Sequence, residues 1–257
     1  MTFQRALSAV ALLGLAACPT FTNLKTARAI DQGEFQLTVA PEIIGAAIPA
    51  GNGTGSTNFT LPQIEVAGRY GISDGFDIGA RLWIAGLELD STISLLRGGF
   101  DLALAPGVGF FGIGGSSTAS TNGSTSSSTA SIMEVPIYIP LLAGLNFGAG
   151  HQFVFGAEAI PTIVLLGSSS GASSSSGSAF ELFAGGTAGV SFRVTPTFRI
   201  MPEVNVFVPV VTAATSNGNS ASALGSSGGI IYQFALGFSF GNDGFKRYGQ
   251  PALPAAM

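Results

Sequence analysis

Residues that could carry out catalysis are few in this sequence. The chain of 257 residues contains one histidine, His151, and one cysteine, Cys18. A serine nucleophile requires a positioned general base, and a zinc site requires several His, Cys or carboxylate ligands. Serines are abundant at 116–128 and 168–178, but His151 falls in a short turn that is predicted to lie far from both runs. The sequence therefore predicts no enzyme, metal site or cofactor.

Most charged residues instead alternate with apolar ones. Glu65 and Arg69 alternate with apolar neighbours, and Asp77 and Arg81 do the same after the turn Gly-Ile-Ser-Asp-Gly. A period of two residues is typical of a β-strand, because successive side chains point to opposite faces. The two segments are therefore predicted to form an antiparallel hairpin with one apolar and one charged face.

The same alternation recurs along the chain and predicts ten strands. They cover residues 34–44, 62–70, 76–84, 87–95, 100–110, 132–142, 152–164, 180–193, 198–210 and 230–240. Every second connection is long and rich in Ser, Gly, Thr or Asn, namely 49–58, 112–131, 167–178 and 212–228, with the short reversal at 85–86 as the exception. Because such runs cannot bury apolar area, we expect the long ones to be mobile loops.

In each of the ten strands the side chains form two alternating sets, here called phases, and one phase contains no Asp, Glu, Lys or Arg. The other phase holds eleven acids and four arginines: Glu34, Glu42, Glu65, Asp77, Glu88, Asp90, Asp101, Glu134, Glu158, Glu181 and Glu203, with Arg69, Arg81, Arg193 and Arg199. A charge facing lipid at mid-bilayer costs about 2–4 kcal/mol. The uncharged phase is therefore predicted to face lipid, and the charged residues are predicted to line a lumen.

Composition favours a membrane barrel over a soluble Gly/Ser-rich β-sandwich, which is the alternative. Charged residues make up 9% of the chain and hydrophobic residues 46%, whereas soluble domains average about 25% charged residues. No apolar stretch of the mature chain reaches the ~20 residues of a spanning helix. We therefore predict an all-β fold, a closed antiparallel up-and-down transmembrane β-barrel of about ten strands over residues 34–240, with eight or twelve as alternatives.

The interior charges allow two interpretations. The arginines could pair with the acids and fill a narrow barrel, or the excess of acids could line a water path that prefers cations. Small residues of the inner phase, such as Gly107, Gly185 and Gly237, are expected to leave some room.

The N-terminus reads as a secretory signal, with a basic start at Arg5 and an apolar region at 6–17. Leu15-Ala16-Ala17-Cys18 resembles the lipobox of bacterial lipoproteins. This resemblance implies a signal peptide at 1–17, lipidation of Cys18, and a periplasmic lead at 18–33. The alternative is cleavage after Ala29, since Ala27-Arg28-Ala29 fits the small-x-small rule.

The chain resembles small outer-membrane β-barrel proteins of Gram-negative bacteria. The resemblance rests on the lipobox, the repeated hairpin and the aromatic last strand at 232–240, which is followed by a tail at 241–257. It implies location in the cell outer membrane, contact with lipid, insertion by the barrel assembly machinery, a periplasmic C-terminal tail and no nucleic-acid partner. It leaves the oligomeric state unknown. The expected function is a structural barrel or a narrow passive pore, with adhesion through the Ser/Gly-rich outer loops as an alternative.

Overall fold

The computed structural model describes residues 20–49, 56–121, 124–148, 150–170, 173–216, 219–224 and 229–241. The expected signal peptide at 1–17, Cys18, and all but the first residue of the tail at 241–257 lie outside these ranges. The strands are β1 (Phe35–Pro49), β2 (Ser56–Ser73), β3 (Phe76–Trp83), β4 (Gly86–Leu96), β5 (Phe100–Leu104), β6 (Gly107–Thr121), β7 (Ser124–Phe147), β8 (His151–Ser170), β9 (Ser173–Thr195), β10 (Phe198–Ser216), β11 (Asn219–Leu224) and β12 (Ile230–Gly241). No helix among the described residues is long and apolar enough to cross a membrane.

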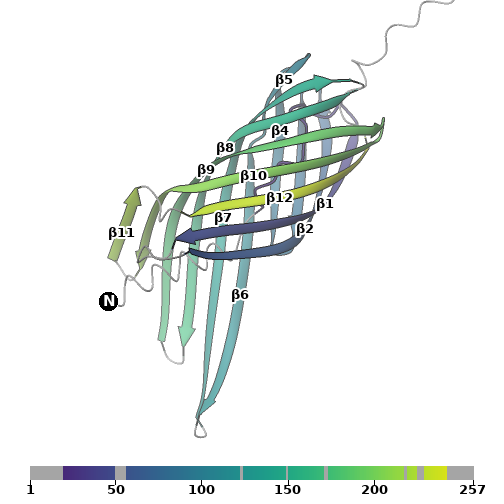
Figure 1. Cartoon of the computed structure of the whole chain (residues 1–257). Coiled ribbons are helices and arrows are strands. Elements are labelled where there is room, and N and C mark those ends of the chain that lie inside the picture. Colours follow the sequence, from purple (N-terminus) through teal and green to yellow (C-terminus); the bar gives the residue numbers. More distant parts are fainter. Residues whose placement is uncertain are drawn as a thin grey trace, which may run out of the picture.

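The strands form one closed antiparallel barrel (Figure 1). Strand β1 pairs with β2 on one side and with β12 on the other, so the first and last strands close the ring. Strands β5 and β6 share one position between β4 and β7, and among the described strands β11 pairs with β10 alone. The ring therefore has ten positions, which confirms the predicted closed up-and-down barrel and rules out the sandwich.

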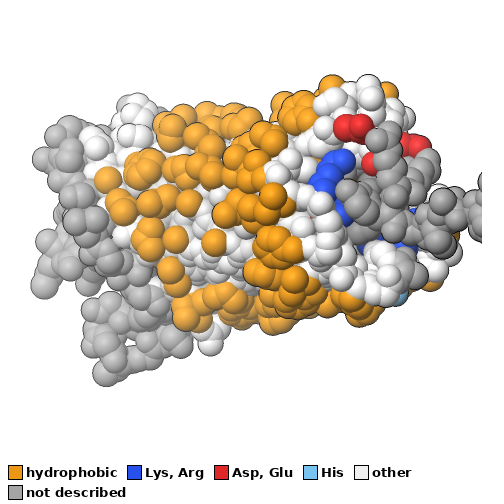
Figure 2. Space-filling view, turned by 90° about the horizontal axis from the view of Figure 1, so that it is seen from above, with side chains coloured by type: hydrophobic (Ala, Val, Ile, Leu, Met, Phe, Trp, Pro, Cys, Tyr) orange, Lys and Arg blue, Asp and Glu red, His pale blue; other side chains and the backbone are white. Residues whose placement is uncertain are grey.

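The predicted phases are also confirmed. On β1, Gln36 and Glu42 are 4% and 3% exposed, while Phe35 and Ile43 are 53% and 47% exposed. Strand β12 repeats the pattern, with Gln233 fully buried and Phe234 on the outer face. Hydrophobic side chains cover the middle of the visible outer surface, and the charged side chains among the coloured residues lie near one end (Figure 2). Period-two alternation thus sorts the side chains into an apolar outside and a polar inside.

The runs at 112–131 and 167–178, which the sequence predicts to be loops, form strands in their described parts. Strands β6 and β7 stay paired from Gly112↔Met133 to Thr121↔Ser124, and β8 and β9 stay paired to Ser170↔Ser173. The β6–β7 hairpin extends well beyond the barrel body (Figure 1). Backbone hydrogen bonds continue the ladder where apolar alternation has ceased, so the sequence pattern ended before the strands did.

Part of the run at 212–228 is likewise a hairpin, because Thr212 to Ser216 pair with strand β11. Residues 50–55 of the first long connection lie outside the described ranges.

The predicted strand at 100–110 is interrupted at Ala105 and Pro106. Proline has no N–H to donate to a ladder. The carbonyl oxygen of Pro106 still accepts a hydrogen bond from the Ser91 N–H at 2.9 Å, and the Ala105 N–H donates to Pro140 O at 3.0 Å. The position in the barrel is therefore continuous, although the strand is split in two.

Candidate functional site in the barrel lumen

The barrel interior is occupied by the chain's own N-terminal residues. Every residue from Thr20 to Ile30, here called the luminal segment, is buried, and Lys25 and Arg28 are only 2% and 1% exposed. The sequence predicts a periplasmic lead at 18–33, whereas the structure places residues 20–30 of it inside the barrel. Its two cations find partners among the interior acids, and its backbone groups bond to side chains of the inner wall.

The luminal segment joins the barrel through a turn at the end where β2 meets β3. The Glu34 N–H donates to Asp31 O at 3.1 Å, and the Gly33 N–H donates to Gly71 O at 2.9 Å. Gly33 has a φ of 78°, in the left-handed region that glycine adopts without steric cost. The chain thus reverses direction between the luminal segment and β1.

Both cations of the luminal segment form ion pairs with the wall. Lys25 Nζ lies 3.0 Å from Asp90 Oδ2 on β4. Arg28 binds Asp101 on β5 through two parallel bonds, Nε to Oδ2 at 3.0 Å and Nη2 to Oδ1 at 2.7 Å. This forked geometry is the strong form of a charge-assisted hydrogen bond. Asp101 also accepts a hydrogen bond from Gln152 Nε2 at 2.8 Å.

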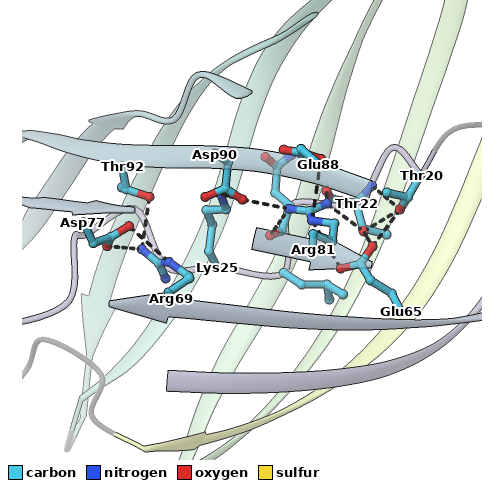
Figure 3. Close-up of polar contacts among 12 residues, drawn as sticks. Thr20, Thr22, Lys25, Glu65, Arg69, Asp77, Arg81, Glu88, Asp90 and Thr92 are labelled. Carbon is cyan, nitrogen blue, oxygen red and sulfur yellow. Dashed lines mark hydrogen bonds and ion pairs between the residues drawn. The ribbon is translucent and has the colours of Figure 1, made fainter. Parts of the chain in front are cut away.

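A second ion-pair network joins strands β2, β3 and β4 (Figure 3). Arg69 Nη2 lies 2.5 Å from Asp77 Oδ2. Arg81 is the centre of the network, 3.4 Å from Glu65, 3.7 Å from Glu88 and 3.8 Å from Asp90. Since Asp90 also binds Lys25, the luminal segment and the wall share one set of charges.

Backbone N–H groups of the luminal segment donate to wall side chains. The Phe21 N–H donates to Gln233 Oε1 at 2.7 Å, and the two oxygens of Glu203 accept from the Asn23 and Leu24 N–H groups at 2.7 and 2.8 Å. Leu24 has a φ of 45°, a conformation that costs a non-glycine residue of order 1–3 kcal/mol. Two successive N–H groups turned toward one carboxylate form an anion-binding concavity, which accounts for this conformation.

The remaining polar groups of the segment follow the same pattern. The Ala27, Ala29 and Ile30 N–H groups each donate at 2.8 Å, to Gln152, Ser94 and Asp77 respectively. The hydroxyls of Thr20 and Thr22 both donate to Glu65 Oε2 at 2.8 Å. Arg81 donates to the carbonyl oxygens of Thr22 and Asn23. An extended peptide is therefore held by side chains and not by a β-ladder.

Apolar side chains of the segment fit into three clusters. Phe21 packs on Phe207 and Phe183, with ring centroids 4.8 and 5.9 Å apart, inside a layer that also contains Ile44, Ala46, Tyr138, Ile160 and Ile231. Leu24 packs with Met201, Ala40 and Ala235, and Ala27 packs with Ala105 and Leu142.

The small inner residues, which were expected to leave room, are in close contact with larger side chains of the segment or of the wall. A Cβ added at Gly237 would lie 3.0 Å from Leu24 Cδ2. One added at Gly107 would lie 2.5 Å from Glu88 Oε1, and Gly185 lies against the ring of Phe207. The small residues make space for larger side chains that then fill it.

The structure places most of the charged residues predicted from the sequence inside the barrel. Buried are Glu65, Arg69, Asp77, Arg81, Glu88, Asp90, Asp101, Glu134, Glu158, Arg199 and Glu203, whereas Glu34, Glu181 and Arg193 are half-buried. Glu65, Arg81, Glu88 and Asp90 form one network, but Glu134, Glu158 and Glu181 lie apart from it on β7, β8 and β9. Arg199 donates to Ser191 Oγ at 2.7 Å and to Gly150 O at 2.8 Å.

Sequence reasoning missed the luminal segment, Gln152 and Gln233. The available signal was Lys25 and Arg28, two cations just before a barrel whose predicted interior contains a large excess of acids. His151 lies at the start of β8, where its Nδ1 accepts the Arg193 N–H at 3.0 Å. Within the described ranges, no group of three or more His, Cys, Asp or Glu side chains is placed to hold a metal ion.

A closed strand ring with an apolar outer surface and a charged interior defines an integral outer-membrane β-barrel, because closure satisfies every backbone group in lipid. This chain is such a barrel, and it lies in the outer membrane.

No family model and no curated protein matches the chain. Solved structures similar to it include the outer membrane protease OmpT from Escherichia coli, with 9% identity and a TM-score of 0.48 over 85% of this chain and 100% of that chain. The translocator domain of autotransporter NalP from Neisseria meningitidis has 12% identity and a TM-score of 0.49 over 93% of this chain and 94% of that chain. The outer membrane protein OprG from Pseudomonas aeruginosa has 14% identity and a TM-score of 0.37 over 84% of this chain and 99% of that chain.

Proposed function

We propose that the protein is a structural outer-membrane barrel whose passage is closed by its own luminal segment. The observation that carries this proposal is the burial of every residue from Thr20 to Ile30, with Lys25 and Arg28 both paired to wall carboxylates. Removing one partner from a buried ion pair costs about 3–5 kcal/mol. Leaving the lumen would separate both pairs and take Phe21 and Leu24 out of their apolar clusters, so the closed state is favoured.

Conductance across a planar bilayer tests this proposal. The purified protein, inserted with the luminal segment intact, should show no steady ion current at moderate voltage. The double variant Lys25→Glu/Arg28→Glu places two negative charges beside Asp90 and Asp101 and should conduct. A steady current through the unaltered protein would refute the closed barrel.

The second candidate is a narrow cation-preferring pore, which the acid excess favours. Five interior carboxylates form no ion pair within the described part of the chain: Glu42, Glu134, Glu158, Glu181 and Glu203. Fixed negative charges along a water path attract cations. If the protein conducts, Glu134→Gln together with Glu181→Gln should reduce the cation preference measured by reversal potential in a salt gradient, whereas Asp74→Asn, outside the lumen, should not.

Adhesion through the outer hairpins is a weaker candidate. The runs at 112–131 and 167–178 contain no acidic or basic residue and no Trp or Tyr. Tight interfaces depend mainly on Trp, Tyr and Arg anchors. Hydration of the barrel mouth by Ser and Thr hydroxyls fits this composition better. We also propose no enzymatic activity, because His151 lies beside the Arg193 backbone and far along β8 from the Ser168–Ser170 end.

We further propose that signal cleavage occurs at the lipobox and that Cys18 is lipidated. Cleavage there retains the luminal segment, whereas cleavage after Ala29 would remove Lys25, Arg28 and the two backbone N–H groups that bind Asp90, Asp101 and Glu203 respectively. Cys18→Ser should abolish labelling with a radioactive fatty acid. An N-terminal sequence beginning at Ile30 in the purified protein would overturn this assignment.

A further inference from the structure

The ring of strands is complete without the luminal segment. Every position of the barrel pairs with its two neighbours through strands β1 to β10 and β12, and the segment contributes no strand to that ladder. Its backbone N–H and C=O groups bond instead to side chains of β2, β3, β4, β8, β10 and β12. The segment therefore lies in the barrel as a bound peptide ligand lies in its binding site.

The wall recognises this segment at spaced positions. Apolar side chains at positions 21, 24 and 27 each enter a separate cluster, and the cations at positions 25 and 28 each meet one aspartate. Glu203 and Gln233 fix the backbone between these contacts. Contacts of this kind define a sequence pattern, Phe-x-x-Leu-Lys-x-Ala-Arg, and not merely a charge.

We propose that the inner wall of the barrel is a binding site for an extended basic peptide, that Thr20–Ile30 occupies it in cis, and that the site retains this affinity for the peptide in trans. This inference extends the proposed function, since an emptied site would be the route for ions, but peptide binding does not require that route to conduct.

The covalent link between ligand and site is short and accessible. Gln32 and Gly33 are exposed, and a Cβ at Gly33 would meet nothing within 4 Å. Strand pairing begins only at Phe35. A cut between Gln32 and Gly33 therefore frees the segment without touching the barrel ladder. The alternative signal cleavage after Ala29 falls close by, so the choice of cleavage site decides whether the ligand stays attached to the barrel.

The test begins with the full chain carrying a specific protease site inserted between Gln32 and Gly33. The protein is folded, inserted and only then cut, so the segment is present during folding. We expect the fragment to copurify with the barrel in intact-mass spectra after cutting. Denaturant below the unfolding range of the barrel should release it, and a synthetic peptide of residues 20–30 should then rebind saturably.

Two matched controls define the recognition. A peptide with Lys25→Glu and Arg28→Glu should bind at least ~100-fold more weakly, because it places like charges beside Asp90 and Asp101. A barrel with Gly237→Leu, made and cut in the same way, should bind the native peptide more weakly because the new side chain takes the place of Leu24.

The outcomes separate this inference from the proposed function. Loss of the fragment on cutting together with no saturable binding of the peptide would overturn the peptide site, as would equal binding of the charge-reversed peptide. Steady current through the uncut protein would refute the closed barrel but leave peptide binding standing. Saturable binding that also blocks the current of the emptied barrel would support both.

Discussion

The wall formed by β2, β3 and β4 differs from the wall formed by β7, β8 and β9 in how its interior charges are compensated. On the first wall, Glu65, Asp77, Glu88 and Asp90 all lie within ion-pair distance of Arg69, Arg81 or Lys25. On the second wall, Glu134, Glu158 and Glu181 form no ion pair among the described residues. Glu158 instead accepts a hydrogen bond from the Asn23 amide at 3.2 Å.

This difference shows that the luminal segment is held in two ways. Toward β4 and β5 it is fixed by the ion pairs of Lys25 and Arg28. Toward β8, β9 and β10 it is fixed by hydrogen bonds from the Asn23 side chain and from the Asn23 and Leu24 N–H groups, and by Phe21 in its aromatic layer. Charged contacts impose position because a misplaced buried charge is costly, whereas apolar contacts contribute roughly in proportion to area. Substitutions on the two walls should therefore change the free energy of unfolding by different amounts and, in one pair of variants, in opposite directions.

The largest effect is expected for Arg81→Met. This substitution leaves Glu65, Glu88 and Asp90 without their shared cation and removes two bonds to the segment's carbonyl oxygens. The free energy of unfolding should fall by roughly 3–5 kcal/mol, as for other buried pairs that lose one member. The change in unfolding free energy is measured from the urea concentration at which half of the protein has lost the folded band on unheated gels. A loss below about 1 kcal/mol would show that the network contributes little.

Phe21→Ala should have the next largest effect. Truncating a buried phenylalanine costs about 3–5 kcal/mol, but here the loss is limited to the free energy that holds the segment in the lumen. We expect a loss of about 3 kcal/mol and proteolysis between residues 20 and 30 in the inserted protein. Thr26→Ala is the control, since among the described residues the Thr26 hydroxyl donates to Arg28 O of the same segment and to no wall residue. Equal protease resistance of the two variants would contradict the role of Phe21.

Opposite signs are expected for Glu65→Gln and Glu158→Gln. Glu65 is paired with Arg81 and accepts two hydroxyl bonds, so its neutralisation should cost about 2 kcal/mol. Glu158 has no cation partner among the described residues, and a carboxyl group is costly to bury without one. The uncharged Gln keeps an oxygen that can accept from the Asn23 amide, so the unfolding free energy should rise by about 1 kcal/mol. The unfolding free energies of both variants are measured by the same urea titration. Destabilisation by Glu158→Gln comparable to that by Glu65→Gln would remove the distinction between the walls.

The sequence predicted the barrel wall well because lipid imposes one rule on every strand. Outer positions such as Phe35, Ile43 and Phe234 must be apolar, so period two is visible without any knowledge of partners. The luminal segment obeys no such rule. Its residues satisfy contacts on many strands, each specific to one place, and no local pattern encodes them. Lys25 and Arg28 were visible as charges, but their partners Asp90 and Asp101 lie far along the chain.

The ends of the strands could also not be predicted from the alternation of apolar and polar residues. Past Ile113 and Ile132 the hairpin of β6 and β7 leaves the apolar belt, and its Ser and Thr residues no longer alternate with apolar ones. The ladder continues there because any residue except proline can donate and accept backbone hydrogen bonds.

The smallest effect is expected when that outer hairpin is shortened. Residues 117–128 can be replaced by Asn-Gly, which favours the two-residue turn of a hairpin and leaves the pair Ser116↔Thr129 next to the new turn. The removed pairs lie beyond the last apolar outer residues, Ile113 and Met133, so no lipid-facing area is lost. Of the pairings between β7 and β8, the deletion removes Ser128↔Ser170 and keeps Thr129↔Ser169. Insertion should be complete and the unfolding free energy should change by less than about 0.5 kcal/mol, in contrast to Arg81→Met. Failure to insert would show that this hairpin helps to build the barrel.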